Sequence, residues 1–125
     1  MPSNSRFEAL LAAFLFAACG CSSSTAPQKA SAQLRFGARV ARQGYWQEAR
    51  FRFQQAVALD PGNPHAHNDL AVALEAVGEF GAAFDEYKKA VSLAGADKAI
   101  HQNYTKFAEF YSAYTKRIGK VNSAP

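Results

Sequence analysis

Residues 44–61 read GYWQEARFRFQQAVALDP, and residues 78–93, which begin 34 positions further on, read GEFGAAFDEYKKAVSL. The two stretches agree in side-chain character at seven positions, and one more pair agrees at the same offset upstream. The pairs are Phe36 and Leu70, Gly44 and Gly78, Trp46 and Phe80, Ala49 and Ala83, Phe53 and Tyr87, Ala56 and Ala90, Val57 and Val91, and Leu59 and Leu93. A period of this length is typical of stacked helix–turn–helix units. The repeat therefore predicts helices over 30–43, 46–59, 64–77 and 80–93.

The residue types at the repeated positions have physical roles in such a stack. Gly44 and Gly78 are expected to end a helix, because glycine adopts left-handed backbone angles without steric cost. Small residues allow two helices to approach closely, and aromatic residues fill the wedge between neighbouring hairpins. We expect Ala49, Ala56, Ala83 and Ala90 in the first role, and Trp46, Phe53, Phe80 and Tyr87 in the second. Pro61 and Pro64 should stop one helix and start the next.

Residues 30–97 resemble the tetratricopeptide repeat family in period, in the inter-helix turn at 44–49 and 78–83, and in the ending of the second helix at 53–61. The resemblance implies an all-α fold, a short right-handed solenoid of two hairpins, 30–63 and 64–97. It also implies protein binding on a concave groove lined by the first helix of each repeat. Carried over, the groove positions include Arg35, Arg42, His65, Asn68, Asp69, Val72, Glu75, Gln102, Asn103 and Lys106. At the positions of the family's carboxylate clamp, Asp69 would repel a carboxylate, so a clamp of that kind is not expected.

A long final helix is predicted over residues 98–120. Asp97 is a suitable cap, and an apolar stripe at helical spacing follows it, with Gly119 at the end and a disordered tail at 121–125. The stripe consists of Ile100, Tyr104, Phe107, Tyr111, Tyr114 and Ile118. The last repeat of a solenoid leaves an apolar face exposed unless a capping element covers it, so the helix is interpreted as that cap. A second interpretation adds a partner-binding surface at its far end, at Phe110, Tyr111 and Tyr114.

The first residues have the pattern of an export signal. Residues 9–18 form an apolar run too short to span a bilayer, which predicts a signal peptide over 1–18 and a flexible tether over 19–29. Phe16-Ala17-Ala18-Cys19 resembles the lipobox of bacterial lipoproteins, in which the cysteine is acylated. That resemblance predicts a lipid on Cys19, and Gly20 after it favours the outer membrane, facing the periplasm. An ordinary secretory signal cut after an alanine is the alternative.

Charge is segregated along the chain. Residues 29–59 hold six bases and one acid (+5), residues 60–97 two bases and seven acids (−5), and residues 98–125 five bases and one acid (+4). Complementarity between neighbours and solvated outer faces would account for this. A functional interpretation places Arg35, Arg39 and Arg42 on one face of the first helix, available to an acidic partner or to anionic lipid.

The 125 residues allow one small domain, and no pattern in them indicates catalysis. There is no phosphate loop, nucleophile elbow or metal-ligand spacing, and the basic residues are not interleaved with aromatics as in nucleic-acid binders. We therefore expect no enzyme activity, cofactor, metal or nucleic acid. The predicted function is an envelope-anchored adaptor for another envelope protein or peptide segment, similar to pilotins of pilus or secretion assembly. The alternatives are self-association through the aromatic end and an accessory role in a cell-wall enzyme complex.

Overall fold

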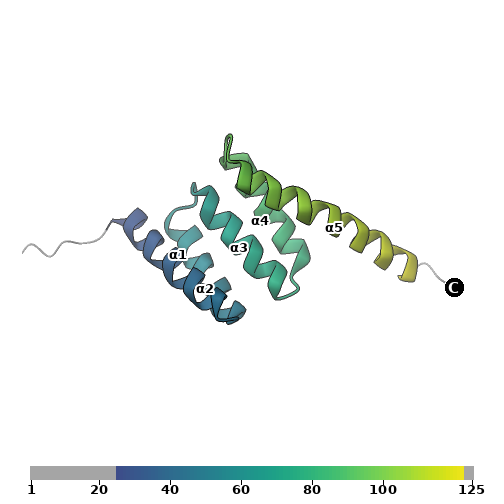
Figure 1. Cartoon of the computed structure of the whole chain (residues 1–125), viewed down its shortest axis with the longest axis horizontal. Coiled ribbons are helices and arrows are strands. Elements are labelled where there is room, and N and C mark those ends of the chain that lie inside the picture. The colour runs from purple at the N-terminus through teal and green to yellow at the C-terminus, as the bar shows by residue number, and fades with distance from the viewer. Residues whose placement is uncertain (1–24, 123–125) are drawn as a thin grey trace, which may run out of the picture.

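The computed structural model describes residues 25–122, and within that range the regular structure is entirely α-helical (Figure 1). The helices are α1 (Ala26–Arg42), α2 (Trp46–Leu59), α3 (Pro64–Ala76), α4 (Phe80–Leu93) and α5 (Lys98–Asn122). The pairs α1–α2 and α3–α4 form hairpins, α2 packs on α3, and α4 packs on α5. The expected all-α fold of two stacked hairpins followed by a long last helix is confirmed.

The turns inside the two hairpins use glycine as the repeat predicts. Gly44 has φ of 85° and Gly78 has φ of 82°, so both lie in the left-handed region. Their amides close the preceding helices by donating to Ala41 and Glu75 carbonyls at 2.9 and 3.0 Å. The helices that follow, α2 and α4, have the same bounds as the sequence predicts.

Small residues set the close approach between paired helices. Ala49, Ala56, Ala83 and Ala90 are all completely buried, which confirms their expected role. Gly37 of α1 is the tightest position, since a Cβ built there would lie 2.5 Å from Cε1 of the Phe53 ring. The first hairpin therefore depends on the absence of a side chain at residue 37.

One hydrophobic core runs through both hairpins and reaches α5. It joins Val40, Phe53, Leu70, Leu74, Tyr87 and Phe107, all less than a tenth exposed. Phe53 and Tyr87 fill the wedge positions. Trp46 and Phe80 pack against the same core but stay partly exposed. The stacked arrangement of the hairpins is thus held by a continuous apolar interior rather than by the turns.

Two helix ends differ from the prediction by more than one residue. Helix α1 begins at Ala26 rather than at residue 30, so residues 26–29, expected in the tether, are helical. Pro27 lies in the first turn, where proline is tolerated, and the Gln28 side chain accepts a hydrogen bond from the Thr25 amide at 2.9 Å.

Helix α5 is the second difference, because it continues through Gly119 to Asn122. Gly119 does not adopt a positive φ, so it costs some helix propensity without ending the helix. Val121 and Asn122, expected in the tail, are helical, and residues 123–125 lie outside the described range. Asp97 caps the helix as predicted, with Oδ1 accepting from the amides of Ala99 and Ile100 at 3.0 and 3.2 Å.

Replacing Gly37 by alanine should destabilise the protein. The new methyl group would overlap the buried Phe53 ring, and overpacking of this kind costs about 1–3 kcal/mol. The better helix propensity of alanine stabilises the helix by less than this. We expect a net fall in the free energy of unfolding, measured by urea titration. Gly119→Ala is the matched control, since its Cβ would meet open space, and it should leave stability equal or slightly higher. Equal stability of both variants would contradict the packing described.

Candidate functional site

Helix α3 is the centre of the molecule and carries five of the predicted groove residues. It contacts α1 on one side and α5 on the other, and we call the face formed by α1, α3 and α5 the groove face. His65 and Glu75 are exposed on α3, Asp69 and Val72 are half-buried, and Asn68 is buried. The predicted residues of α5 are Gln102 and Lys106, both exposed, and Asn103, half-buried.

Two amides join α3 to α5 across this face. Nδ2 of Asn103 donates to Oδ1 of Asn68 at 3.0 Å, and Nδ2 of Asn68 lies 3.3 Å from Oδ1 of Asp69. Because Asn68 is only 8% exposed, its hydrogen-bonding groups serve the helix interface. Of the predicted groove residues, Asn68 is thus placed to position its neighbours rather than to contact a partner.

Beside this link lies a small hollow of about 170 Å³ on the groove face. Its walls are Glu75 of α3, Tyr87 of α4, and Asn103, Lys106, Phe107 and Phe110 of α5. Oε2 of Glu75 accepts a hydrogen bond from the Tyr87 hydroxyl at 2.9 Å. Burial, followed by the effect of Glu75, raises the pKa of Tyr87 above its usual value, so the hydroxyl remains a donor. The hollow can admit one side chain between an acidic and a basic wall.

Asp69 is a partly buried carboxyl group, and burial disfavours its charged form. Burial raises its pKa above the usual 3.8, and the hydrogen bond from Asn68 and the charge of His65 only partly oppose this. Among residues 25–122, no lysine or arginine forms an ion pair with Asp69 or Glu75. The middle of the groove face therefore carries negative charge that the fold leaves uncompensated.

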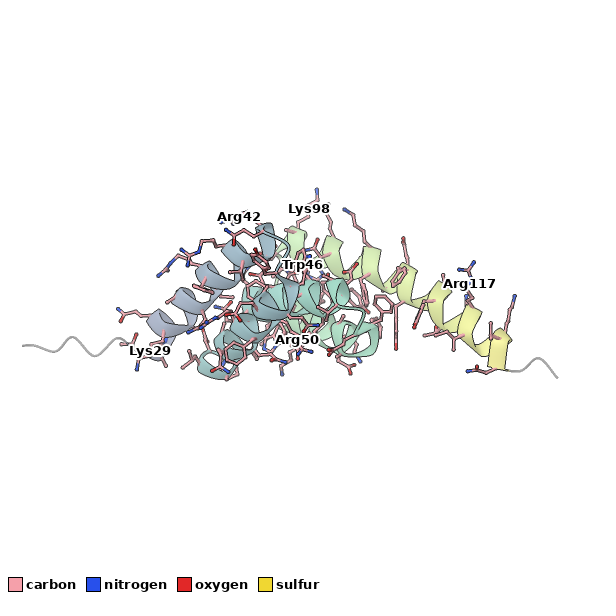
Figure 2. All side chains as sticks on the ribbon, turned by 90° about the horizontal axis from the view of Figure 1, so that it is seen from below. Lys29, Arg42, Trp46, Arg50, Lys98 and Arg117 are labelled. Atoms are coloured by element: carbon pink, nitrogen blue, oxygen red, sulfur yellow. The ribbon has the colours of Figure 1, made fainter. Side chains whose placement is uncertain are left out.

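The three arginines predicted to share one face of α1 are all on the continuous helix, and they differ in their neighbours. Arg35 and Arg42 are exposed, and Arg42 projects on the same side of the molecule as Lys98 of α5 (Figure 2). Arg39 instead places its guanidinium 4.7 Å from the centre of the Phe36 ring, which Arg52 of α2 also covers at 4.4 Å. Arg39 is exposed as well, and the use of the three arginines as a binding stripe stays a prediction.

The aromatic residues predicted to form a partner-binding surface on α5 differ in their exposure. Tyr111 is half-buried and stacks on Phe84 with ring centres 4.9 Å apart. Phe110 and Tyr114 pack edge-on against Phe80, at 5.1 and 4.9 Å, yet remain 45% and 36% exposed. Tyr111 therefore helps to hold α5 against α4. Phe110 and Tyr114 also contact α4, and each keeps an exposed part that a partner could contact.

Sequence reasoning missed one polar link. His67 is buried, with Nδ1 2.6 Å from Oε2 of Glu86 and Nε2 2.8 Å from the carbonyl oxygen of Pro61. Through this contact Glu86 ties α4 to α3. The glutamate lies 19 residues from the histidine, so no local pattern could indicate the pair.

The described part of the chain, residues 25–122, contains no group of three histidine, cysteine or acidic side chains arranged to hold a metal. In the same range, no helix has the length and apolar character needed to cross a bilayer. The signal peptide predicted over 1–18 and the acylation predicted at Cys19 lie outside the described residues.

A comparison with protein families matches residues 41–103 to the model described as tetratricopeptide repeat. The match begins near the end of α1 and ends inside α5, so it spans both hairpin turns and half of the chain. No curated protein matches the chain.

The burial of Asp69 leads to a pH-dependent prediction. Since its pKa is raised in the folded state, ionisation of this group disfavours folding at neutral pH. Asp69→Asn, which can still accept from Asn68, should therefore raise the melting temperature at pH 7. The gain should vanish as the pH falls below 3.8, where the carboxyl is protonated in both states. Asp85→Asn, on the exposed surface of α4, should give no gain, and a loss of stability in Asp69→Asn at pH 7 would refute the interpretation.

Proposed function

The chain belongs to the tetratricopeptide repeat family, and on that premise we propose that it is an adaptor attached to the bacterial cell envelope, with no catalytic activity of its own. Repeats of this family generally mediate protein–protein interaction. The finer proposal is that the partner is another envelope protein or a peptide segment of one, bound during assembly of an envelope complex. A role like that of a pilotin in pilus or secretion assembly is consistent with a domain of this size.

The observation that carries the adaptor proposal is the hollow beside the α3–α5 link. It combines Glu75 and Lys106, which have opposite charges and no ion-pair partner among residues 25–122, with the exposed ring of Phe110. Such a mixed polar and aromatic lining suits a protein side chain better than a metal or a nucleic acid. Most residues of the groove face remain accessible, while the buried Asn68 below them keeps α3 and α5 in register.

Attachment to the envelope is supported by sequence alone. Ala17 and Ala18 precede a cysteine that closes an apolar run, as in the lipobox of bacterial lipoproteins. A lipid on Cys19 would leave only a short tether before α1 begins at Ala26. Several acyl chains would give stable anchoring, and Gly20 after the cysteine favours the outer membrane, with the protein facing the periplasm.

Two other functions remain as alternatives. Self-association would use the exposed Phe110 and Tyr114 at the end of α5. Service as an accessory subunit of a cell-wall enzyme complex would use the same groove face as the adaptor does.

Photo-crosslinking tests the adaptor proposal. A photoreactive residue replacing exposed Lys106 should crosslink to a second protein in intact cells, because it lies at the hollow. The same residue replacing exposed Gln55 on α2 is the control and should give no such product. Recovery of the chain alone, or crosslinked only to itself, would refute the adaptor and favour self-association.

Acyl labelling tests the anchor separately. Wild-type protein should incorporate a labelled fatty acid, and Cys19→Ser should lose the label, because serine lacks the thiol that is acylated. Cys21→Ser, which leaves Cys19 in place, should keep it. Equal labelling of wild type and Cys19→Ser would exclude the proposed anchor without affecting the adaptor proposal.

A further inference from the structure

Helix α5 extends beyond the helices that support it. Phe80 is the first residue of α4, and it contacts Phe110 and Tyr114 of α5. After Tyr114, α5 continues for about two more turns to Asn122, and Figure 1 shows this end projecting past the other helices. Ile118 and Val121, on the same side as Tyr114, are 39% and 70% exposed. We call residues 110–122 the distal segment of α5.

Two adjoining hollows lie along the distal segment. One, of about 370 Å³, is bounded by Phe110, Ala113, Tyr114 and Arg117. The other, of about 690 Å³, is bounded by Ala113, Lys116, Arg117, Lys120 and Val121. They share Ala113 and Arg117, so they form one continuous depression along the helix.

The residues that line the depression have the spacing of a helix-packing site. Phe110, Ala113, Arg117 and Val121 recur at intervals of three and four, and Tyr114 lies four residues after Phe110 and three before Arg117, which places them on one side of α5. The short side chain of Ala113 lies between larger neighbours, and small residues at such points allow another helix to approach closely. A straight apolar ridge on a second helix would fill the depression.

The charged side chains around the depression are all basic. After Glu109, the distal segment carries Lys116, Arg117 and Lys120 and no acid. Neither Lys116 nor Arg117 forms an ion pair within the described residues 25–122. Positive charge at a helix C-terminus complements the helix dipole, but the dipole does not account for exposed Val121 and the apolar floor beside it. An occupant with carboxylates at its flanks would be complementary in both respects.

The charge and shape also argue against two other occupants. A second copy of α5, packed tail to tail, would bring Arg117 and Lys116 of both copies together, which is a like-charge contact. A lipid surface is flat, whereas this side of α5 is hollowed at Ala113 and its rings at Phe110 and Tyr114 turn their edges to Phe80.

We propose that the distal segment of α5 is a docking site for an amphipathic helix of another protein, one that presents an apolar ridge flanked by acidic residues. The proposal rests on the adaptor function and names a class of partner for it. This site adjoins the hollow around Glu75 and Lys106, with which it shares Phe110, and it extends from there to the end of α5.

The probe is a fluorescent helical peptide with leucines along one side and glutamates on both flanks. A matched peptide replaces each glutamate by lysine. In anisotropy titrations against the full chain, the acidic peptide should bind about tenfold or more tightly than the basic one. Equal binding of the two peptides, or no binding of either, would overturn the proposal.

Variants locate the binding. Arg117→Glu should weaken the acidic peptide about tenfold and reverse the preference between peptides. Ala113→Trp should fill the depression and abolish binding, and because Ala113 is exposed, a thermal melt should show an intact fold. Lys98→Glu makes the same charge change at the other end of α5 and should have little effect. Equal loss in Lys98→Glu and Arg117→Glu would indicate bulk charge and overturn the proposal.

Two further measurements identify the other occupants. Concentration-dependent dimerisation in sedimentation experiments, lost in Ala113→Trp, would assign the depression to a second copy. Binding to anionic phosphatidylglycerol vesicles but not to the peptide would assign it to lipid. Either result overturns the proposal. If Lys106 crosslinks to a partner while the peptide fails to bind, only this inference fails; if both experiments fail, the adaptor function fails too.

Discussion

The close approach of α1 to α2 at Gly37 is the constraint on which the rest of the structure depends. The Phe53 ring occupies the space that a side chain at residue 37 would need, and the same ring belongs to the core that continues through Leu70 and Tyr87 to Phe107. The fully buried alanines Ala49 and Ala83 keep each hairpin tight enough for these rings to meet. Since the interior is continuous, the orientation of each hairpin is determined by its neighbour.

Polar links at α3 then determine which faces remain available. His67 binds Glu86 of α4, and Asn68 accepts from Asn103 of α5. Both side chains of α3 are buried and have hydrogen-bond partners. These hydrogen bonds determine how the helices are oriented across an otherwise apolar contact. They hold the exposed residues of α3 and α5 on one face. That face is built on rigid helices, an arrangement that favours binding with little loss of conformational entropy.

A pair of hairpins is short for an array of this family, and α5 compensates for the missing repeats. Its first half closes the core with Ile100 and Phe107, both 2% exposed. Its second half passes Phe80, the first residue of α4, which packs against Tyr114. One helix thus combines a stabilising function with a surface for interaction, and the change from one to the other falls near Tyr114.

The sequence by itself determined the repeat, the hairpin turns at Gly44 and Gly78, the wedge residues and the cap at Asp97, because each depends on local spacing or on backbone angles that only a few residue types adopt. It could not show that Phe36 of α1 is covered by Arg52 of α2 as well as by Arg39. The pairing of His67 with Glu86, the burial of Asp69 and the point at which α4 stops supporting α5 were likewise decided by tertiary structure. Each of these joins residues on different helices, and their distances are determined by packing rather than by position along the chain.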